Sequence, residues 1–583
     1  MEFIVQNFVP LLFVGLLFFL LTGFPVAFCL AATGLTFGFI GMEAGLFPPA
    51  LFQAIPLRIF GIMQNETLLA IPFFTFMGIV LEKSGMAEDL LETVGQVFGP
   101  LRGGLALATI FVGALLAATT GVMAAAVISM GLISLPIMLR YGYNRSIATG
   151  VITASGTLAQ AIPPSLVLIV MADQLGRSVG DMYAGAIVPG LMLVSLYALT
   201  IVALTILRPS WVPALPPEAL IYKEANGASG HWSLLAILSI AIAAGFAWSA
   251  LHDGIVNPLV GREGKAPMDE ILILSMTAAS LVALVLALAN RWLRIGLLSK
   301  LSERVVFVLL PPLVLIFLVL GTIFLGIATP TEGGAMGALG ALIMAVSRRR
   351  LGFDPLRQAL ENTAKLSCFV MFILIGATVF SFTFNAADGH LWVERLFAQL
   401  PGGQLGFLIA VNLLVFVLGC FIDFFEIAFI VIPLLVPVAD KMGINLVWFG
   451  VIIAMNLQTS FLTPPFGFAL FYLRSVAARF DYTDRVTSER IPAVTTLQIY
   501  KGSVLFITLQ FMMVAALLAF PNLVTDRLDK APPVNLESIE LEAEPQYYDS
   551  QEDPTLPQPR GASREEDPME AVRRAIEEDA KKE

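Results

Sequence analysis

Long apolar stretches separated by short polar segments dominate the pattern of this chain. A hydrocarbon layer about 30 Å thick needs roughly 17 to 25 apolar residues in each helix that crosses it. Stretches of that length predict spanning helices at residues 8–22, 25–42, 66–82, 184–207, 233–251, 270–290, 305–326, 328–347, 366–384 and 503–520. The pattern therefore predicts an all-α, polytopic membrane protein.

Two longer apolar blocks, residues 102–140 and 402–440, carry a polar or small-residue tip at their middle. The tips consist of Thr119, Thr120 and Gly121 in the first block and of Asp423 and Glu426 in the second. Each block predicts a re-entrant helical hairpin. Two spans joined by a very tight turn fit the hydropathy equally well.

Each hairpin block is followed by a helix that a proline pair breaks. Residues 145–172 contain Pro163-Pro164, and residues 445–474 contain Pro464-Pro465. Proline removes an amide donor and restricts the residue before it, so a helix breaks there. Non-helical backbone at membrane depth is tolerated only where it lines a cavity or is buried in protein. The sequence therefore predicts two broken transmembrane helices, and their breaks are candidate binding sites.

The hairpins and broken helices recur within the chain. A separation of 301 residues relates Pro136 to Pro437, Gly142 to Gly443, Asn144 to Asn445 and Pro163 to Pro464. This repeat predicts two related halves, 1–207 and 301–520, and an insertion at 208–300 that carries two extra spans. Residues 86–98, apolar at helical spacing beside three acidic residues, predict an interfacial helix in the first half.

The distribution of basic residues predicts an orientation. With the N-terminus outside, the predicted inner loops hold 20 Lys and Arg residues and the outer loops hold 6, the tail set aside. Such an excess is typical of cytoplasmic loops. The first hairpin then opens from the cytoplasm and the second from outside, which makes the halves an inverted-topology repeat.

Composition supports the membrane prediction and locates the acidity. The chain is 57% hydrophobic and 13% charged, which excludes a soluble globular protein. Nearly all of its net charge of −10 arises in the C-terminal tail, residues 521–583, where positions 526–583 hold 17 acidic and 8 basic residues. This tail is rich in Pro and Glu, so it is predicted to be disordered and, by the topology, periplasmic.

Five fragments, in this order along the chain, carry a family resemblance. They are Gly23-Phe-Pro-Val-Ala-Phe28, Ile162-Pro-Pro-Ser165, Ala328-Thr-Pro-Thr-Glu332, Asp423 with Ile432-Pro-Leu-Leu-Val-Pro437, and Leu462-Thr-Pro-Pro-Phe-Gly467. The chain resembles the large membrane subunit (M, DctM-like) of tripartite ATP-independent periplasmic (TRAP) transporters. The insertion and the second tip resemble most the branch often labelled mannitol/chloroaromatic.

The resemblance implies a fold and a function. The fold would be similar to that of the ion transporter superfamily, and the protein would be an elevator-type transporter. The chain would be the permease subunit of a sodium-coupled importer of small organic acids, oxo- or hydroxy-acids among them, in a bacterial inner membrane. Its partners would be a small four-helix membrane subunit (DctQ-like), a periplasmic substrate-binding protein and the lipid bilayer. Na⁺ would be the coupling ion, with no cofactor and no nucleic acid.

Helix ends at the tips and breaks suit both ion and acid. Carbonyls at half-helix C-termini attract a cation such as Na⁺, and half-helix N-termini attract a carboxylate. In the first half the candidate residues are Thr119, Thr120, Gly121, Ser155, Gly156, Thr157, Gln160, Pro163, Pro164 and Ser165. In the second half they are Asp423, Glu426, Asn456, Gln458, Thr459, Ser460, Thr463, Pro464 and Pro465, while Thr331 and Glu332 are candidates for a structural or coupling role.

The predicted site lacks its own cationic side chains. No Lys or Arg lies at a break or a tip, so helix dipoles and bound Na⁺ would have to balance an acid's charge, and substrate affinity would depend steeply on sodium. Two other classes stay open: a stand-alone carrier of the sodium/dicarboxylate symporter kind, and, more distantly, an intramembrane enzyme. An enzyme is disfavoured because the sequence has neither a His-Glu-x-x-His zinc motif nor a Gly-x-x-x-x-Gly-Lys phosphate loop.

Overall fold

The computed structural model describes residues 2–121, 123–222, 230–261, 264–293, 298–484, 486–526 and 528. The side chains of Thr119 and Thr120 are outside this description, although their backbone is within it. The predicted tail lies outside the described residues from 529 onward. Within the described ranges the chain is helical, apart from one short antiparallel pair formed by β1 (Tyr482–Thr483) and β2 (Arg490–Ile491).

The helices of the first half and the insertion follow the predicted order. They are α1 (Glu2–Gln6), α2 (Phe8–Leu21), α3 (Val26–Glu43), η1 (Pro49–Ala54), α4 (Ile55–Met63), η2 (Thr67–Leu69), α5 (Ala70–Lys83), α6 (Met86–Phe98), α7 (Gly104–Thr120), α8 (Met123–Arg140), α9 (Arg145–Thr157), η3 (Leu158–Gln160), α10 (Leu166–Leu175), α11 (Val179–Leu207), η4 (Pro209–Trp211), η5 (Pro217–Ala219), α12 (His231–Val260) and α13 (Met268–Leu293).

The second half repeats the arrangement of a hairpin followed by a broken helix. Its elements are α14 (Lys300–Phe324), α15 (Pro330–Ser347), α16 (Phe353–Ala386), α17 (Gly389–Ala398), α18 (Gly403–Gly419), α19 (Phe424–Glu426), a π-helical turn η6 (Ile427–Val431), α20 (Ile432–Lys441), α21 (Leu446–Leu462), α22 (Phe468–Val476), α23 (Thr496–Ala519) and α24 (Asn522–Thr525).

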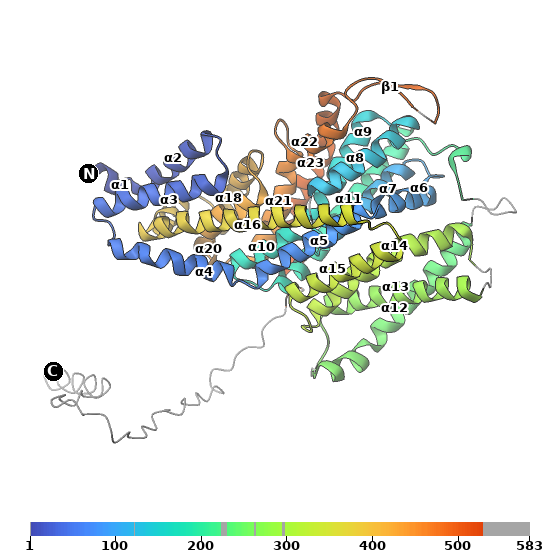
Figure 1. The fold of residues 1–583 in the computed structure, drawn as a ribbon, viewed down its shortest axis with the longest axis horizontal. Coiled ribbons are helices and arrows are strands. Elements are labelled where there is room, and N and C mark those ends of the chain that lie inside the picture. Colours follow the sequence, from blue (N-terminus) through green and yellow to red (C-terminus); the bar gives the residue numbers. More distant parts are fainter. Residues whose placement is uncertain are drawn as a thin grey trace, which may run out of the picture. The chain divides into compact units, whose positions relative to one another are not determined.

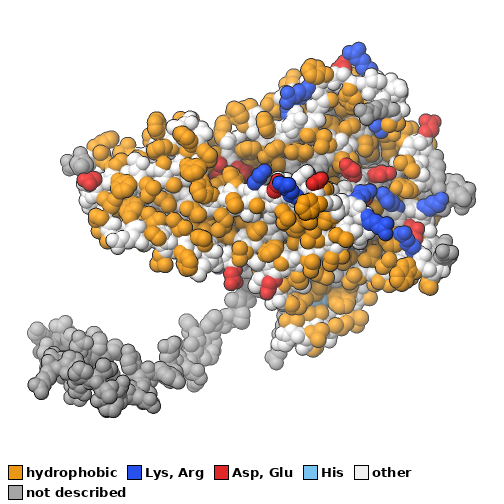
Figure 2. All heavy atoms as spheres, in the orientation of Figure 1, with side chains coloured by type: hydrophobic (Ala, Val, Ile, Leu, Met, Phe, Trp, Pro, Cys, Tyr) orange, Lys and Arg blue, Asp and Glu red, His pale blue; other side chains and the backbone are white. Residues whose placement is uncertain are grey.

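The helices have the length and surface of membrane spans. Eight of them are long and apolar enough to cross a membrane, or ten if each of two bent helix pairs forms one span, counting only the described residues. Figure 2 shows hydrophobic side chains over most of the visible face, with charged ones gathered in a limited part of it. Large apolar side chains such as Phe18, Leu21 and Phe28 are exposed. In water such a surface would aggregate, so the prediction of an all-α polytopic membrane protein is confirmed.

Two groups of closely packed helices can be distinguished within the described chain. In Figure 1, α16 runs beside α3 and α5, and α5 also packs against α15. The other group forms around α9 and α21: α7, α8 and α23 pack on α9, while α18, α10 and α23 pack on α21. The proline-broken helices are thus enclosed by their own hairpins and by α23.

The inserted helices form a bundle with the first helix of the second half. α12 and α13 pack against each other, and α13 packs along α14. A fully buried pair, His252 Nε2 and Glu270 Oε1 at 2.9 Å, joins α12 to α13. The predicted insertion therefore contains two long helices, as its hydropathy indicated.

Equivalent residues begin the two broken helices in the same way. The side chain of Asn144 accepts hydrogen bonds from the amides of Ser146 and Ile147, and that of Asn445 accepts one from the amide of Trp448. Asparagine is a favoured N-cap because its side chain satisfies an amide that the helix leaves unpaired. The 301-residue spacing in the sequence therefore corresponds to a shared local structure.

Some elements were not predicted. The chain between the second and third expected spans holds α4, and Pro49–Met63 with Thr67–Lys83 form a helix pair bent by 50°. The short helix α17 precedes the second hairpin at a bend of 114° to α18. Both segments are shorter than a membrane span, so a search for long apolar runs does not detect them.

Candidate functional site

The first break is a tight, buried turn between α9 and α10. The 3-10 turn η3 ends α9, and a cis peptide bond joins Pro163 to Pro164. Ser165 begins α10: its hydroxyl accepts a hydrogen bond from the Val167 amide at 3.2 Å and donates one to the Gln160 carbonyl at 3.0 Å. Because these side chains are buried, the break is held by its own polar groups rather than by solvent.

The tip of the first hairpin lies against the start of α10. α7 ends at Thr120 and is capped by Gly121, whose backbone is left-handed with φ +58° and whose amide donates to the Ala117 carbonyl. A Cβ atom at this position would lie 3.1 Å from Leu166 Cγ, so only glycine fits here without a shift. The structure therefore brings the first tip and the first break together.

The second break shares the proline geometry but is more exposed. A cis peptide bond joins Pro464 to Pro465 after α21 ends at Leu462. Thr463 is partly exposed, and its hydroxyl donates to the Thr459 carbonyl at 2.8 Å. Pro465 is exposed, and its carbonyl accepts from Tyr500 Oη at 3.1 Å. This turn therefore lies nearer the surface of the described chain than the first.

The acidic side chains of the second tip cap their own helix. The Asp423 carboxylate accepts from the Glu426 amide, and the Glu426 carboxylate accepts from the Asp423 amide at 3.1 Å. Such a reciprocal capping box satisfies amides that would otherwise stay unpaired at the helix start. Glu426 is buried, whereas Asp423 also lines a cavity. A structural role thus explains Glu426, and Asp423 combines capping with access to the cavity.

A cavity of about 650 Å³ joins the two tips and the first break. Its size falls within the range of small-molecule sites. It is lined by α5 (Thr75, Gly78, Ile79, Glu82, Lys83), the first hairpin (Gly121, Met123, Ala124, Ala125), the first break (Gln160, Leu166, Val167), α16 (Asn362, Lys365, Leu366, Phe369), the second tip (Asp423, Phe424, Phe425) and Tyr472 of α22. Of the predicted site residues, it brings together Gly121, Gln160 and Asp423.

The charges of this cavity differ from the expectation. Lys83 and Lys365 line it, so an acid bound there would meet cationic side chains as well as helix ends. Neither lysine belongs to a break or a tip, which is why the motifs did not reveal them. The available signal was that each lysine lies directly beside a predicted span. Lys83 follows residues 66–82, and Lys365 precedes residues 366–384.

Most of the other predicted hydroxyl groups bond within their own helix. Ser155 donates to the Val151 carbonyl, Thr157 to that of Ala154 and Ser460 to that of Asn456, at 2.6, 2.9 and 3.5 Å. Serine and threonine commonly make such bonds in membrane helices. Asn456 also bonds outside its helix, donating to the Asn412 carbonyl at 2.6 Å. These side chains are buried, and none of them lines the cavity.

Gly156 serves close helix packing, since a Cβ atom there would lie 2.3 Å from Val127 Cγ2 of α8. Thr331 and Glu332 lie at the start of α15, away from the cavity lining. Glu332 forms a capping box with Thr329, and the Thr331 hydroxyl donates to the Glu66 carbonyl. These contacts fit the structural role among the two roles expected for Thr331 and Glu332.

Several buried oxygens near the breaks have no hydrogen-bond partner among the described residues. They are Gln160 Oε1 at the first break and Gln458 Oε1, Thr459 Oγ1 and Asn412 Oδ1 near the second. Hard cations take oxygen ligands, and buried polar atoms without partners are costly. Gln458 and Thr459 therefore keep buried oxygens of the type that Na⁺ takes as ligands. No group of three or more His, Cys, Asp or Glu side chains suits another metal within the described ranges.

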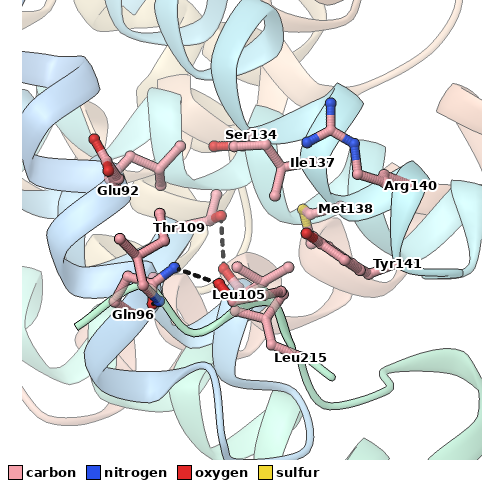
Figure 3. A pocket seen from close by; sticks show the side chains of 14 residues that line it. Glu92, Gln96, Leu105, Thr109, Ser134, Ile137, Met138, Arg140, Tyr141 and Leu215 are labelled. Atoms are coloured by element: carbon pink, nitrogen blue, oxygen red, sulfur yellow. Dashed lines mark hydrogen bonds between the residues drawn. The ribbon is translucent and has the colours of Figure 1, made fainter. Parts of the chain in front are cut away.

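A second cavity, of about 240 Å³, has no residue of the breaks in its lining, and Figure 3 shows the side chains around it. Its lining comes from α6, α7, α8 and the linker after α11. Gln96 of α6 fixes this linker, donating to the Ala219 carbonyl at 3.0 Å and accepting from the Ile221 amide at 2.9 Å. No predicted site residue lines this cavity, so the 650 Å³ cavity is the stronger candidate for a binding site.

The fold and the site together define a multi-pass, all-helical membrane protein with two proline-broken helices beside a cavity. Residues 13–523 match the family described as "Tripartite ATP-independent periplasmic transporter, DctM component", and the chain belongs to that family. It is therefore a transporter permease and not an enzyme, as predicted.

Two relatives and one solved structure are similar to this chain. The chain is 27% identical over 533 residues to the C4-dicarboxylate TRAP transporter large permease protein DctM of Rhodobacter capsulatus, covering 88% of this chain and 99% of that one. It is 25% identical over 469 residues to the isethionate TRAP transporter permease protein DctMQ of Oleidesulfovibrio alaskensis, covering 80% of this chain and 60% of that one. The YdaH transporter of Alcanivorax borkumensis is similar at 13% identity and a TM-score of 0.47, covering 81% and 88%.

Proposed function

We propose that this chain is the permease of a sodium-coupled, binding-protein-dependent importer of small organic acids in a bacterial inner membrane. The observation that carries the proposal is the 650 Å³ cavity between the first break and both hairpin tips. Relatives named for C4-dicarboxylate and isethionate transport support acidic substrates. The name DctMQ of one relative, and the description of the family as a tripartite component, support a small DctQ-like membrane subunit and a periplasmic binding protein as partners.

The position of the cavity supports an elevator movement. Part of its lining comes from α5 and α16, and the rest comes from the hairpins and the two broken helices. Movement of the second set along the first would carry a bound acid across the membrane without opening a continuous pore. The basic-residue count supports an inverted repeat with the N-terminus and tail outside.

Different residues of this chain bind the ion and the acid. Gln458 and Thr459 would hold Na⁺ through oxygens that lack other partners, and the ion would supply positive charge that favours acid binding. Gln160 and the start of α10 face the cavity, where an amide group and a helix N-terminus bind a carboxylate or hydroxyl group. Pro163 and Pro164 keep the backbone between η3 and α10 from forming a continuous helix.

Uptake in proteoliposomes tests the proposal. The vesicles hold the full chain with the small subunit, and the binding protein is added with radiolabelled succinate or isethionate. We expect uptake that requires both an inward sodium gradient and the binding protein. Uptake of either acid without sodium would refute the coupling, and sodium-driven uptake without the binding protein would favour the stand-alone carrier. Absence of uptake of both acids would contradict the substrate class.

A further inference from the structure

Two lysines from different helices line the candidate site. Lys83 is the last residue of α5, and Lys365 lies within α16, 282 positions later in the chain. Both side chains are exposed and contribute to the wall of the 650 Å³ cavity. In the part of the chain that the structure describes, neither lysine forms an ion pair or a hydrogen bond.

The acidic residues of the same cavity have other partners. Glu82 accepts a hydrogen bond from Ser129 Oγ at 3.2 Å. Asp423 caps the helix that starts with Phe424. Both carboxylates therefore accept hydrogen bonds within the protein, whereas neither ammonium group donates one among the described residues. The N–H groups of the two lysines therefore remain available to donate to an oxygen of a molecule inside the cavity.

We infer that Lys83 and Lys365 form an anion-binding subsite for the acid group of the transported substrate. The inference rests on the proposed function and names the cationic part of that site. A lysine ammonium group offers three donors and a compact positive charge to a carboxylate or sulfonate. Lysines at the edge of a membrane also extend toward water for reasons unrelated to binding, and this is the competing explanation that a test must separate.

The first test removes the charges. Succinate or isethionate uptake is measured in the complete system for wild type, Lys83→Gln, Lys365→Gln and the double variant, each at saturating sodium. Because both lysines are exposed and solvent screens their charge, we expect each single variant to raise the half-saturating concentration about two- to fivefold and the double variant to raise it more. Lys501→Gln, at an exposed position of α23 outside the cavity lining, is the matched control and should behave as wild type.

The second test restores charge in the folded protein. Cys368 is exposed and lies one helical turn after Lys365, so the background carries Cys368→Ser. Lys365→Cys in this background should lose affinity for the acid. Modification with 2-aminoethyl methanethiosulfonate, which adds an ammonium group, should restore affinity, and the 2-sulfonatoethyl reagent should lower it further. The acid should also slow both modification reactions.

The outcomes separate the inference from the proposed function. If wild type transports the acids and the lysine variants match it, the subsite is refuted and the proposed function stands. If wild type transports neither acid, the proposed function fails and the inference falls with it. If a charge variant does not fold, the chemical restoration decides, because it changes the charge after folding. Equal effects of the two reagents would also refute the subsite.

Discussion

The two proline breaks share a backbone but differ in their surroundings. Pro163 and Pro164 are buried, and the turn they form contributes to the wall of the largest cavity described. Pro465 and the following Phe466 are exposed, Phe466 by 60%. A repeat in the sequence thus specified the shape of the two turns, while the surroundings of each turn depend on the helices packed around it.

The side chains at equivalent positions show the same divergence. The 301-residue separation relates Gln160 to Phe461 and Ser165 to Phe466. The first break therefore carries an amide and a hydroxyl group where the second carries two aromatic rings. In the second half the buried polar residues lie earlier, inside α21, where Gln458 and Thr459 keep oxygens without partners. This difference supports the proposal that the first break binds the acid and that α21 binds the ion.

The largest expected effect comes from exchanging the amide at the first break. Gln160→Leu should lower acid uptake at limiting concentration about tenfold or more, since a buried hydrogen-bonding group facing the cavity is lost. Phe461→Leu, at the equivalent position of the second half, should retain at least half of the uptake. Both are measured in the complete reconstituted system. Equal losses in the two variants would show that the breaks do not differ in function.

Much of the fold followed from the sequence because the membrane restricts the possible structures. Apolar runs predicted the long helices, and the recurring asparagines marked helix starts that the structure places at Asn144 and Asn445. The helix expected at 86–98 coincides with α6. Short elements such as α4 were not predicted, because nine residues are too few to form an apolar stretch of the length of a membrane span.

Less of the site than of the fold could be predicted from the sequence, because the cavity lining comes from segments far apart in the chain. Gln160 was identified because it lies in the broken motif itself. Lys365 was not, because only the fold brings α16 beside the first hairpin and its tip. Conversely, the motif suggested a ligand role for Gly156, which the structure explains by the close approach of Val127.

A smaller effect should follow from removing the helix cap of the first break. Ser165→Ala eliminates the hydroxyl that accepts from the Val167 amide, and loss of such a cap costs about 1 kcal/mol of stability. We expect a lower midpoint of thermal unfolding in detergent. Phe466→Ala at the second break should lower it less, because that side chain is largely exposed. A reversed order would mean that the exposed turn is the more tightly held of the two.

The smallest effect concerns an ion pair that links the end of the first hairpin to the segment after the second broken helix. Arg140 donates to both carboxylate oxygens of Asp484, from Nε at 3.1 and 3.0 Å and from Nη2 at 2.9 Å. The Arg140 guanidinium, with the Thr487 amide, holds the pKa of Asp484 well below its usual range. A depressed pKa stabilises the folded state fully above the unfolded value of about 4, and this contribution is lost as the pH falls below it.

Lowering the pH from 7 to 5 should therefore leave the contribution of this ion pair intact. Asp484→Asn should lower the midpoint of thermal unfolding at both pH values and weaken the dependence of that midpoint on pH below 4. Asp481→Asn, which removes a more exposed partner of Arg490, is the matched control and should shift the midpoint less. An unchanged midpoint in Asp484→Asn would show that the two halves are held together without this ion pair.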